Sequence, residues 1–203
     1  MKLFYTPGTS SLFPHIALHE AGLAFKTIKV DEHTKLMEDG RDYRAVNPLG
    51  LVPALQLDDG TILTEGVAIA QHIADQVPAK QLAPPNLTLA RTQLQSWLNF
   101  IASEMQMGCF CPLFHPTTSE PAKTVYRERL ASRLGHVDQH LAQNQYMLGK
   151  DFSLADAYLF VVSNWSRLAK VDLAPYPYIL GLHKRVSARP AVQAALRGEG
   201  LAS

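Results

Sequence analysis

A proline inside a strand-like run, followed by an acidic entrance to a helix, is the part of this sequence best suited to hold a small peptide. The apolar runs Val52–Leu57 and Thr61–Leu63 flank Asp58-Asp59-Gly60, which predicts a β-hairpin. Pro53 cannot donate to a strand ladder, so we expect it at a strand's first residue, at an edge, or after a cis Val52–Pro53 bond. Each arrangement leaves the N–H and C=O of Val52 free to pair with an extended ligand backbone.

The two residues after the hairpin, Glu65 and Gly66, could hold the end of such a ligand. Glu65 offers a carboxylate to an ammonium group. Gly66 opens the next helix, whose free N–H groups suit a carboxylate. An amino-acid head group needs both partners. The alternative is an ordinary hairpin followed by a solvated acid in the first turn of a helix.

Cysteine and histidine give little support for metal or redox chemistry. Cys109 and Cys111 lack the CxxC spacing of a redox or zinc motif, so we interpret them as small hydrophobic residues. The histidine pairs 15/19 and 136/140 fall at i, i+4, but no third ligand with motif spacing accompanies either pair. The sequence therefore predicts no metal site.

Composition excludes several classes of partner. The chain has 203 residues, of which 47% are hydrophobic and 18% charged, and its net charge is +1. These values are typical of a globular protein, and the absence of a basic stripe argues against nucleic acid. Pro7 and Gly8 interrupt the N-terminus before a signal-peptide core forms, and no apolar stretch is long enough to span a bilayer. We therefore expect a cytoplasmic protein without membrane contact.

The predicted secondary structure changes near residue 80, from strands mixed with helices to helices alone. Lys2–Tyr5, Ser11–Ala21 and Phe25–Val30 predict a strand, a helix and a parallel strand. A polar segment with a short helix, the hairpin, and a helix over 66–77 complete the first half. The proline-rich residues 79–86 predict a linker. We expect an α+β protein with domains at 1–78 and 87–203, the second all-helical, with helices at 87–107, 125–144, 154–169 and 178–189.

Two of the predicted helices carry polar patterns. In the first of these helices, one face is apolar and holds Trp97 and Ile101. The other face is polar and carries Asn99, Ser103 and Gln106. This polar face either lines a cleft or simply meets water. Ser153 and Asp156 have the spacing of a capping box, in which Ser153 accepts from the N–H of Asp156 and Asp156 accepts from the N–H of Ser153.

These motifs together resemble those of the cytosolic glutathione S-transferases, and most closely the bacterial beta class. The resemblance rests on Met1–Gly8, Val52-Pro53, the run DDGTILTEGVAI, the run from Trp97 to Glu104, and Phe152–Leu159, and it covers nearly the whole chain. It implies a thioredoxin-like N-terminal domain, a helical C-terminal domain, and a homodimer that binds glutathione.

The resemblance also implies roles for individual residues. Val52, beside Pro53, should pair with the cysteinyl backbone of glutathione, while Glu65 and Gly66 hold its γ-glutamyl end. Further contacts are implied for residues from both halves of the sequence, namely Lys35 with the glycyl carboxylate, Asn99 from the helical half, and Ser103 and Glu104 with glutathione of the partner subunit.

The sequence departs from the beta class at two positions. Ser10 and Gln106 stand where that class usually has cysteine and histidine, so mixed-disulfide chemistry and an imidazole acid–base role are in doubt. Stabilisation of the glutathione thiolate by Ser10 or Ser11, at the entrance of the first helix, would still be available. The plain alternative is that both serines cap that helix.

The function implied is a glutathione transferase that conjugates small hydrophobic electrophiles without a metal or prosthetic group. Two alternatives stay open at this point. One is a binding protein of the same fold that has lost turnover. The other is a glutathione-dependent reductase, peroxidase or dehalogenase.

Overall fold

The computed structural model describes residues 1–201, and their contacts divide the chain into two units. The first unit contains Met1–Ala83 together with the segment from Ala188 onward. The second unit is Pro84–Ser187. The α+β class predicted from the sequence is confirmed, because all strands named here lie in the first unit and the second is helical.

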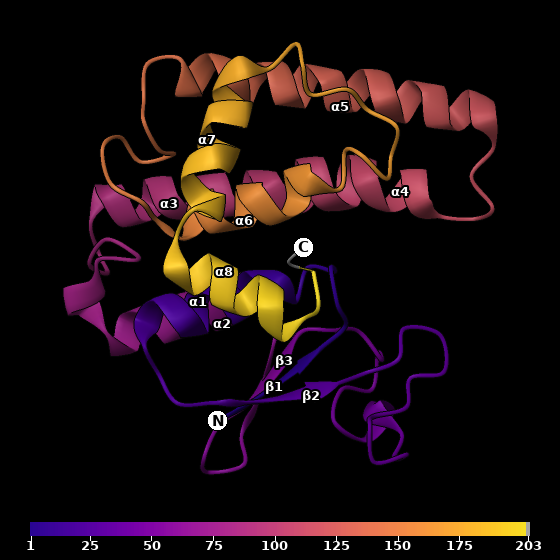
Figure 1. The fold of residues 1–203 in the computed structure, drawn as a ribbon, viewed down its shortest axis with the longest axis vertical. Helices are drawn as coiled ribbons and strands as arrows, with labels where there is room; N and C mark the ends of the chain where they lie inside the picture. Colours follow the sequence, from indigo (N-terminus) through magenta and orange to yellow (C-terminus); the bar gives the residue numbers. More distant parts are fainter. Residues whose placement is uncertain (202–203) are drawn as a thin grey trace. The chain divides into compact units, whose positions relative to one another are not determined.

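The first unit is a four-stranded mixed sheet with helices (Figure 1). The strand order is β2-β1-β3-β4, with β1 parallel to β2 and antiparallel to β3, as the β-α-β opening and the hairpin predict. Its elements are β1 (Lys2–Tyr5), α1 (Leu12–Ala21), β2 (Lys26–Lys29), η1 (Tyr43–Ala45), β3 (Ala54–Gln56), β4 (Ile62–Thr64), α2 (Gly66–Gln76), η2 (Pro78–Lys80) and α8 (Pro190–Gly198).

Buried apolar side chains from the sheet and from the segment after β2 hold this unit together. Phe4 and Ala54, paired across β1 and β3, form a cluster with Val30, Met37 and Tyr43. Val52 packs against the edge of that cluster. The hairpin and the 31–46 segment are therefore fixed to the same core.

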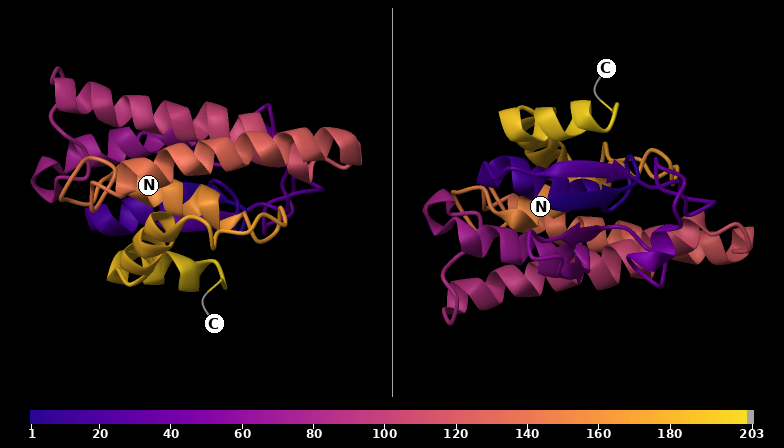
Figure 2. Two further views of the ribbon diagram at one scale, coloured as in Figure 1. Left: turned by 90° about the horizontal axis from the view of Figure 1, so that it is seen from above. Right: turned by 90° about the horizontal axis from the view of Figure 1, so that it is seen from below.

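Contacts group α8 differently from the predicted domain division. We expected residues 87–203 to form one helical domain, but α8 packs on α1 within the first unit. Figure 2 shows α8, in yellow, lying against the indigo α1. Pro190 at the start of the helix and the buried Val192 and Ala195 explain why this segment folds as an amphipathic helix. The proline-rich 79–86 segment also spans the boundary between units, which falls after Ala83.

The second unit consists of helices, of which α5 is the longest (Figure 2). Helices η3, α4 and α7 all contact α5, and α6 packs on α3 and α7. The bounds are α3 (Leu89–Asn99), η3 (Phe100–Phe110), α4 (Cys111–Phe114), α5 (Glu120–Leu141), α6 (Leu154–Asn164) and α7 (Pro177–Ser187).

The segment that the sequence predicts as one helix over 87–107 changes geometry at Phe100. Residues Phe100–Phe110 form a π-helix rather than a continuation of α3. Gly108 shows what this geometry requires, because a Cβ there would lie 2.7 Å from the carbonyl oxygen of Ser103. Only glycine avoids that clash. The segment carrying Ser103, Glu104 and Gln106 is therefore wider than a regular helix.

The predicted capping box at the start of α6 is present. Asp156 is fully buried and accepts from the N–H of Ser153 at 2.8 Å, from its hydroxyl at 2.9 Å, and from the N–H of Met147 at 2.7 Å. Burial nevertheless raises the pKa of Asp156 to about 6. These bonds fix the start of α6 and the segment that precedes it.

Candidate functional site

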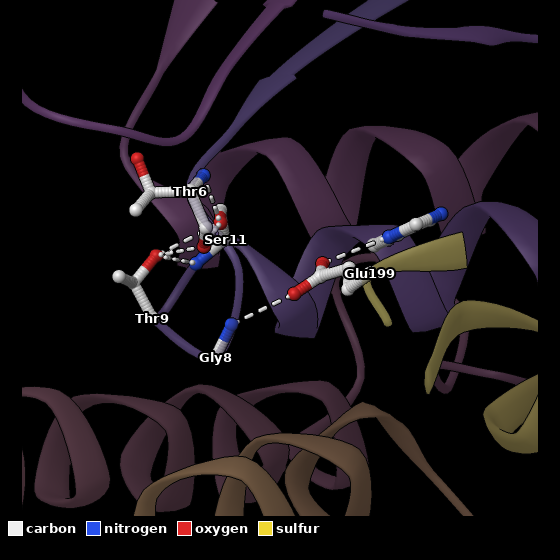
Figure 3. Close-up of polar contacts among 6 residues, drawn as sticks. Thr6, Gly8, Thr9, Ser11 and Glu199 are labelled. Atoms are coloured by element: carbon white, nitrogen blue, oxygen red, sulfur yellow. Dashed lines mark hydrogen bonds and ion pairs between the residues drawn. The ribbon is translucent and has the colours of Figure 1, made fainter. Parts of the chain in front are cut away.

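The loop between β1 and α1 carries two serines whose surroundings differ. Ser11 is fully buried, and its hydroxyl donates to the carbonyl of Thr6 at 3.1 Å and accepts from the N–H of Thr6 at 3.2 Å (Figure 3). Thr9 adds a 2.9 Å contact with the same hydroxyl. Ser10 is partly exposed, and its hydroxyl has no hydrogen-bond partner among residues 1–201. The Ser10 hydroxyl is therefore the one available to a ligand.

Neither serine caps α1 through its side chain, contrary to the capping alternative. Ser11 occupies the cap position with helical dihedral angles and no side-chain capping bond. The N–H groups of Leu12 and Phe13 donate instead to the carbonyls of Thr9 and Ser10. Since backbone carbonyls satisfy these donors, the Ser10 hydroxyl is not needed for capping.

The hairpin and the start of α2 meet where the sequence predicts a peptide site. The Val52–Pro53 bond is cis, which is one of the three arrangements predicted, and Pro53 lies directly before β3 rather than at its first residue. Val52 lies outside β3, and its backbone N–H and C=O make no backbone hydrogen bond with any of the described residues. A Cβ at Gly66 would lie 3.5 Å from Pro53 and 3.8 Å from Phe13. The starts of α1, α2 and β3 therefore lie side by side.

Glu65 is held in a strained backbone conformation at the entrance of α2. Its φ of 67° and ψ of 111° are rare for a residue with a side chain, and that side chain is exposed and makes no capping bond. A non-glycine residue with such angles costs about 1–3 kcal/mol and is concentrated at functional sites. The strain, which no sequence pattern indicates, strengthens the case for Glu65 as a ligand contact.

Lys35 approaches the same segment from the loop after β2. Its aliphatic stem lies beside Gly50, where an added Cβ would come within 3.5 Å of the lysine Cγ and Cδ atoms. Lys35 has a positive φ of 61° and is half-buried. The structure thus brings the stem of Lys35 next to the residues that lead into Val52.

Two residues that the sequence analysis did not single out hold this segment in place. The hydroxyl of Tyr43 and the amide nitrogen of Asn47 both donate to the carbonyl of Leu51, at 2.9 and 2.7 Å. Both residues are buried, and burial raises the pKa of Tyr43 to about 12. Tyrosine and asparagine are ordinary residues in a polar loop. The only sequence pattern that marked either of them was Asn47 before Pro48, which is typical of a turn.

The remaining predicted contacts lie in the second unit, at the end of α3 and in η3. The Ser103 hydroxyl donates to the carbonyl of Asn99 at 2.9 Å, and both residues are exposed. Glu104 accepts from Arg133 at 2.7 and 3.2 Å, and this guanidinium holds the pKa of Glu104 below its usual value. These residues therefore form one polar surface within the second unit.

Gln106 is fixed by a single partner in the second unit. Its side-chain oxygen accepts from the hydroxyl of Tyr158 at 2.7 Å. The oxygen is thus occupied, and the amide nitrogen is the part of Gln106 left to donate. Nearby in sequence, Phe110 and Phe114 pack against Trp165, with ring centroids 5.8 and 6.2 Å from it. Phe114 is exposed, so this aromatic cluster reaches the surface.

Comparison with known proteins identifies the chain from both of its halves. A family model described as the glutathione S-transferase N-terminal domain matches residues 11–76, and one described as the C-terminal domain matches residues 104–198. The chain is 47% identical over 201 residues to glutathione S-transferase GstA of Escherichia coli O157:H7, which covers 99% of this chain and 100% of that protein.

The chain belongs to the glutathione S-transferase family.

Solved structures agree with this membership. The bacterial glutathione S-transferase BphK, in a ternary complex, is 53% identical, and the match covers 99% of this chain and 100% of that one with a TM-score of 0.97. A beta-class enzyme from Sphingomonas chungbukensis is 46% identical over 100% of both chains, with a TM-score of 0.95. The fold expected from the resemblance, a thioredoxin-like domain followed by helices, is thereby confirmed, and the chain is a transferase of this family.

The described part of the chain was also searched for two other features. Within residues 1–201, no helix is long and apolar enough to cross a membrane. In the same range, no three histidine, cysteine, aspartate or glutamate side chains lie close enough together to hold a metal ion.

Proposed function

We propose that this transferase binds glutathione at the start of β3 and α2 and stabilises its thiolate through Ser10. The observation that carries the proposal is the packing of Pro53, directly before β3, beside Gly66 and the strained Glu65 at the entrance of α2. A sphingomonad glutathione S-transferase that is 46% identical to this chain, with a TM-score of 0.95, was solved in complex with glutathione.

Each part of the tripeptide has a partner of suitable chemistry. The free backbone groups of Val52, fixed beside Pro53, would pair with the cysteinyl residue as an added strand. Glu65 would bind the ammonium group of the γ-glutamyl end, and the N–H groups at Gly66 its carboxylate. Lys35, whose stem lies along Gly50, would reach the glycyl carboxylate.

The chemical step needs the thiol as a thiolate. A free thiol has a pKa near 8.5, and one hydrogen bond to the charged sulfur lowers that value. The Ser10 hydroxyl, which has no partner within the described residues, is suited to donate this bond at the start of α1, where the helix dipole adds to the effect. Gln106 cannot act as a proton acceptor near neutrality, so catalysis would depend on positioning and thiolate stabilisation.

For the second substrate we propose a small hydrophobic electrophile that contacts the helical unit. The cluster of Phe110, Phe114 and Trp165 offers an aromatic surface, and the amide nitrogen of Gln106 offers one donor. Asn99 would contribute a polar contact to glutathione, and Ser103 with Glu104 would contact the glutathione of the partner subunit. We also propose a cytoplasmic homodimer that needs no metal or prosthetic group.

The test combines calorimetric titration of glutathione with a steady-state conjugation assay that uses a chloronitrobenzene acceptor. We expect binding together with turnover well above the rate in buffer. Binding without turnover would favour a binding protein of this fold. Turnover only of disulfide, peroxide or halogenated substrates would favour the reductase, peroxidase or dehalogenase alternative. Failure to bind glutathione would reject the proposed site.

A further inference from the structure

A carboxylate from the far end of the sequence is buried behind the loop that carries Ser10. Glu199 directly follows α8, and its side chain has no exposed surface. One oxygen accepts from the backbone N–H of Gly8 at 2.9 Å (Figure 3). The other lies 2.9 Å from Nδ1 of His15, a buried residue of α1. Both oxygens of the carboxylate are thus used to join the end of α8 to α1 and to the loop before it.

Burying a carboxylate is costly unless hydrogen bonds replace its water. Glu199 caps the C-terminal end of α8 through its backbone N–H, which donates to the carbonyl of Ala195 at 3.1 Å, so the helix makes no use of the Glu199 side chain. The approach is nevertheless tight, since a Cβ at Gly198 would come within 3.2 Å of the His15 ring. Glycine at 198 is what lets the backbone before Glu199 reach the ring.

The atom that Glu199 holds belongs to a loop with an unusual backbone. Gly8 has a φ of 73°, in the region that favours glycine. Thr9 and Ser11, the residues directly before and after Ser10, both bond through their side chains to the carbonyl of Thr6 (Figure 3). Ser10 therefore lies between two residues anchored within the loop, and Glu199 adds an anchor at Gly8 from outside the loop.

We propose that Glu199 is a positioning residue, which fixes Gly8 and through it the direction of the Ser10 hydroxyl. This inference rests on the proposed function of Ser10 as the donor to the glutathione thiolate. Glu199 does not touch the ligand in this scheme. His15 orients the carboxylate so that its second oxygen faces the N–H of Gly8.

The test compares three variants. Glu199→Ala removes both bonds. Glu199→Gln is the conservative replacement, because its oxygen can accept from Gly8 while its amide donates to the other tautomer of His15. The matched control is Arg189→Ala at the opposite end of α8, where Arg189 binds Glu20 at 2.6 and 2.9 Å. The control loosens α8 on α1 without reaching the loop. If Glu199→Ala does not fold, Glu199→Asp replaces it, since the shorter acid cannot make both bonds.

The first measurement is amide hydrogen exchange of the unliganded protein under conditions where each variant is folded. We expect the amides of residues 8–11 to exchange about tenfold faster or more in Glu199→Ala, as loss of one hydrogen bond predicts. Arg189→Ala and Glu199→Gln should leave that loop close to wild type. Equal exchange at residues 8–11 in Glu199→Ala and wild type would overturn the proposal, whatever the protein catalyses.

The second measurement follows the bound thiol. The variants are compared at equal folded fractions. We expect Glu199→Ala to raise the pKa of the bound glutathione thiol. We also expect it to lower kcat/KM about ten- to a hundredfold, because a misplaced catalytic group slows the reaction by such factors. The dissociation constant of glutathione should change much less, and Glu199→Gln should restore the rate. A loss of rate in Arg189→Ala as large as in Glu199→Ala would assign Glu199 a merely structural role. A wild type that binds no glutathione would reject the proposed function but leave the exchange result intact.

Discussion

Ser10 and Ser11 are adjacent in the sequence, yet their hydroxyl groups have opposite situations. Ser11 is fully buried and bonds to Thr6, so its hydroxyl closes the loop rather than facing a ligand. Ser10 is partly exposed and has no hydroxyl partner within residues 1–201. The choice between the two serines, which sequence left open, therefore favours Ser10 as the donor.

Replacing Ser10 by alanine should impair the chemistry and spare the binding. Without the donor, the pKa of bound glutathione should rise and conjugation near neutral pH should slow, by about tenfold for each pKa unit if thiolate concentration limits the rate. Affinity should change little, because Glu65, Gly66 and Lys35 still hold the peptide ends. The measurements are the pH–rate profile and calorimetric titration.

Ser11→Ala is the natural comparison. It should lower the melting temperature, because the backbone of Thr6 loses its partner, whereas Ser10→Ala should not. Ser10→Cys should regain a reducible adduct with oxidised glutathione, seen as a mass increase that a reductant reverses. An unmoved pH–rate profile in Ser10→Ala, together with no adduct in Ser10→Cys, would show that position 10 does not face the sulfur.

Glu65 combines a proposed binding role with a strained backbone, so two substitutions should separate these properties. Both Glu65→Ala and Glu65→Gly should weaken glutathione binding by roughly 1.5–3 kcal/mol, the value of a hydrogen bond to a charged group. The glycine variant should be the more stable of the two by about 1 kcal/mol, because glycine adopts the observed φ of 67° without cost. Calorimetry and thermal unfolding measure the two effects.

Glu128→Ala, at an exposed position of α5, serves as the control for loss of a surface carboxylate. It should leave binding unchanged. Wild-type affinity in Glu65→Ala would remove Glu65 from the site.

At the scale of elements, local patterns predicted most of the fold. Alternation and turn residues located β1, β3 and β4, and the capping residues located α6, because these signals act over a few positions. The π-helix at Phe100–Phe110 was missed, since the close approach of Gly108 to the carbonyl of Ser103, which leaves no room for a Cβ, has no periodic signature. The separate helix α8 was also missed, although Arg189-Pro190 followed by Val192 and Ala195 carries a recognisable start signal.

The residues of the candidate site likewise fall into those that sequence could associate with one another and those that it could not. Val52, Pro53, Glu65 and Gly66 lie within one hairpin and helix start, so sequence could associate them. The bond from Glu199 to Gly8 joins residues 191 positions apart, and no pattern in a single sequence predicts such a contact. Tyr43 and Asn47 were missed for a related reason, since their role depends on where the carbonyl of Leu51 lies.

Helix α7 carries a histidine, His183, whose buried position should make stability depend on pH. His183 contacts Ser163 at 2.6 Å, and burial lowers its pKa to about 4 from an ordinary value of 6.5. Because the folded-state pKa is the lower one, the neutral ring's contribution is complete above pH 6.5 and is lost as the pH falls toward 4. We expect the free energy of unfolding of wild type, relative to His183→Phe, to fall by roughly 2–3 kcal/mol between pH 7 and pH 4.5.

The comparison with His183→Phe is needed because Asp156 acts in the opposite direction. Its pKa is raised to about 6, so its contribution grows as the pH falls through 6. Both proteins contain Asp156, so its effect cancels in the difference. Denaturant unfolding at several pH values measures that difference, and parallel curves for the two proteins would contradict the expectation.

At the scale of the whole molecule, we expect a homodimer with two-fold symmetry. The expectation follows from family resemblance, and the exposed polar surface of Asn99, Ser103 and Glu104 is where the partner's ligand would be met. Sedimentation at micromolar concentration should give about twice the mass of the 22.4 kDa chain. A monomer under those conditions would reject the assembly. In a dimer, Glu104→Ala should weaken glutathione binding, and Glu120→Ala on α5 should not.

The return of α8 to α1 has a consequence for synthesis on the ribosome. Residues 1–83 leave the exit tunnel before residues 84–187 have been made, and only then does the segment from Ala188 follow. At about 5–20 residues per second, the face of α1 that α8 covers stays open in the nascent chain for roughly 5–20 s. During that time the buried ring of His15 lacks its carboxylate partner. The first unit to emerge is thus the last to be completed, and its α1 face stays uncovered until α8 has been made.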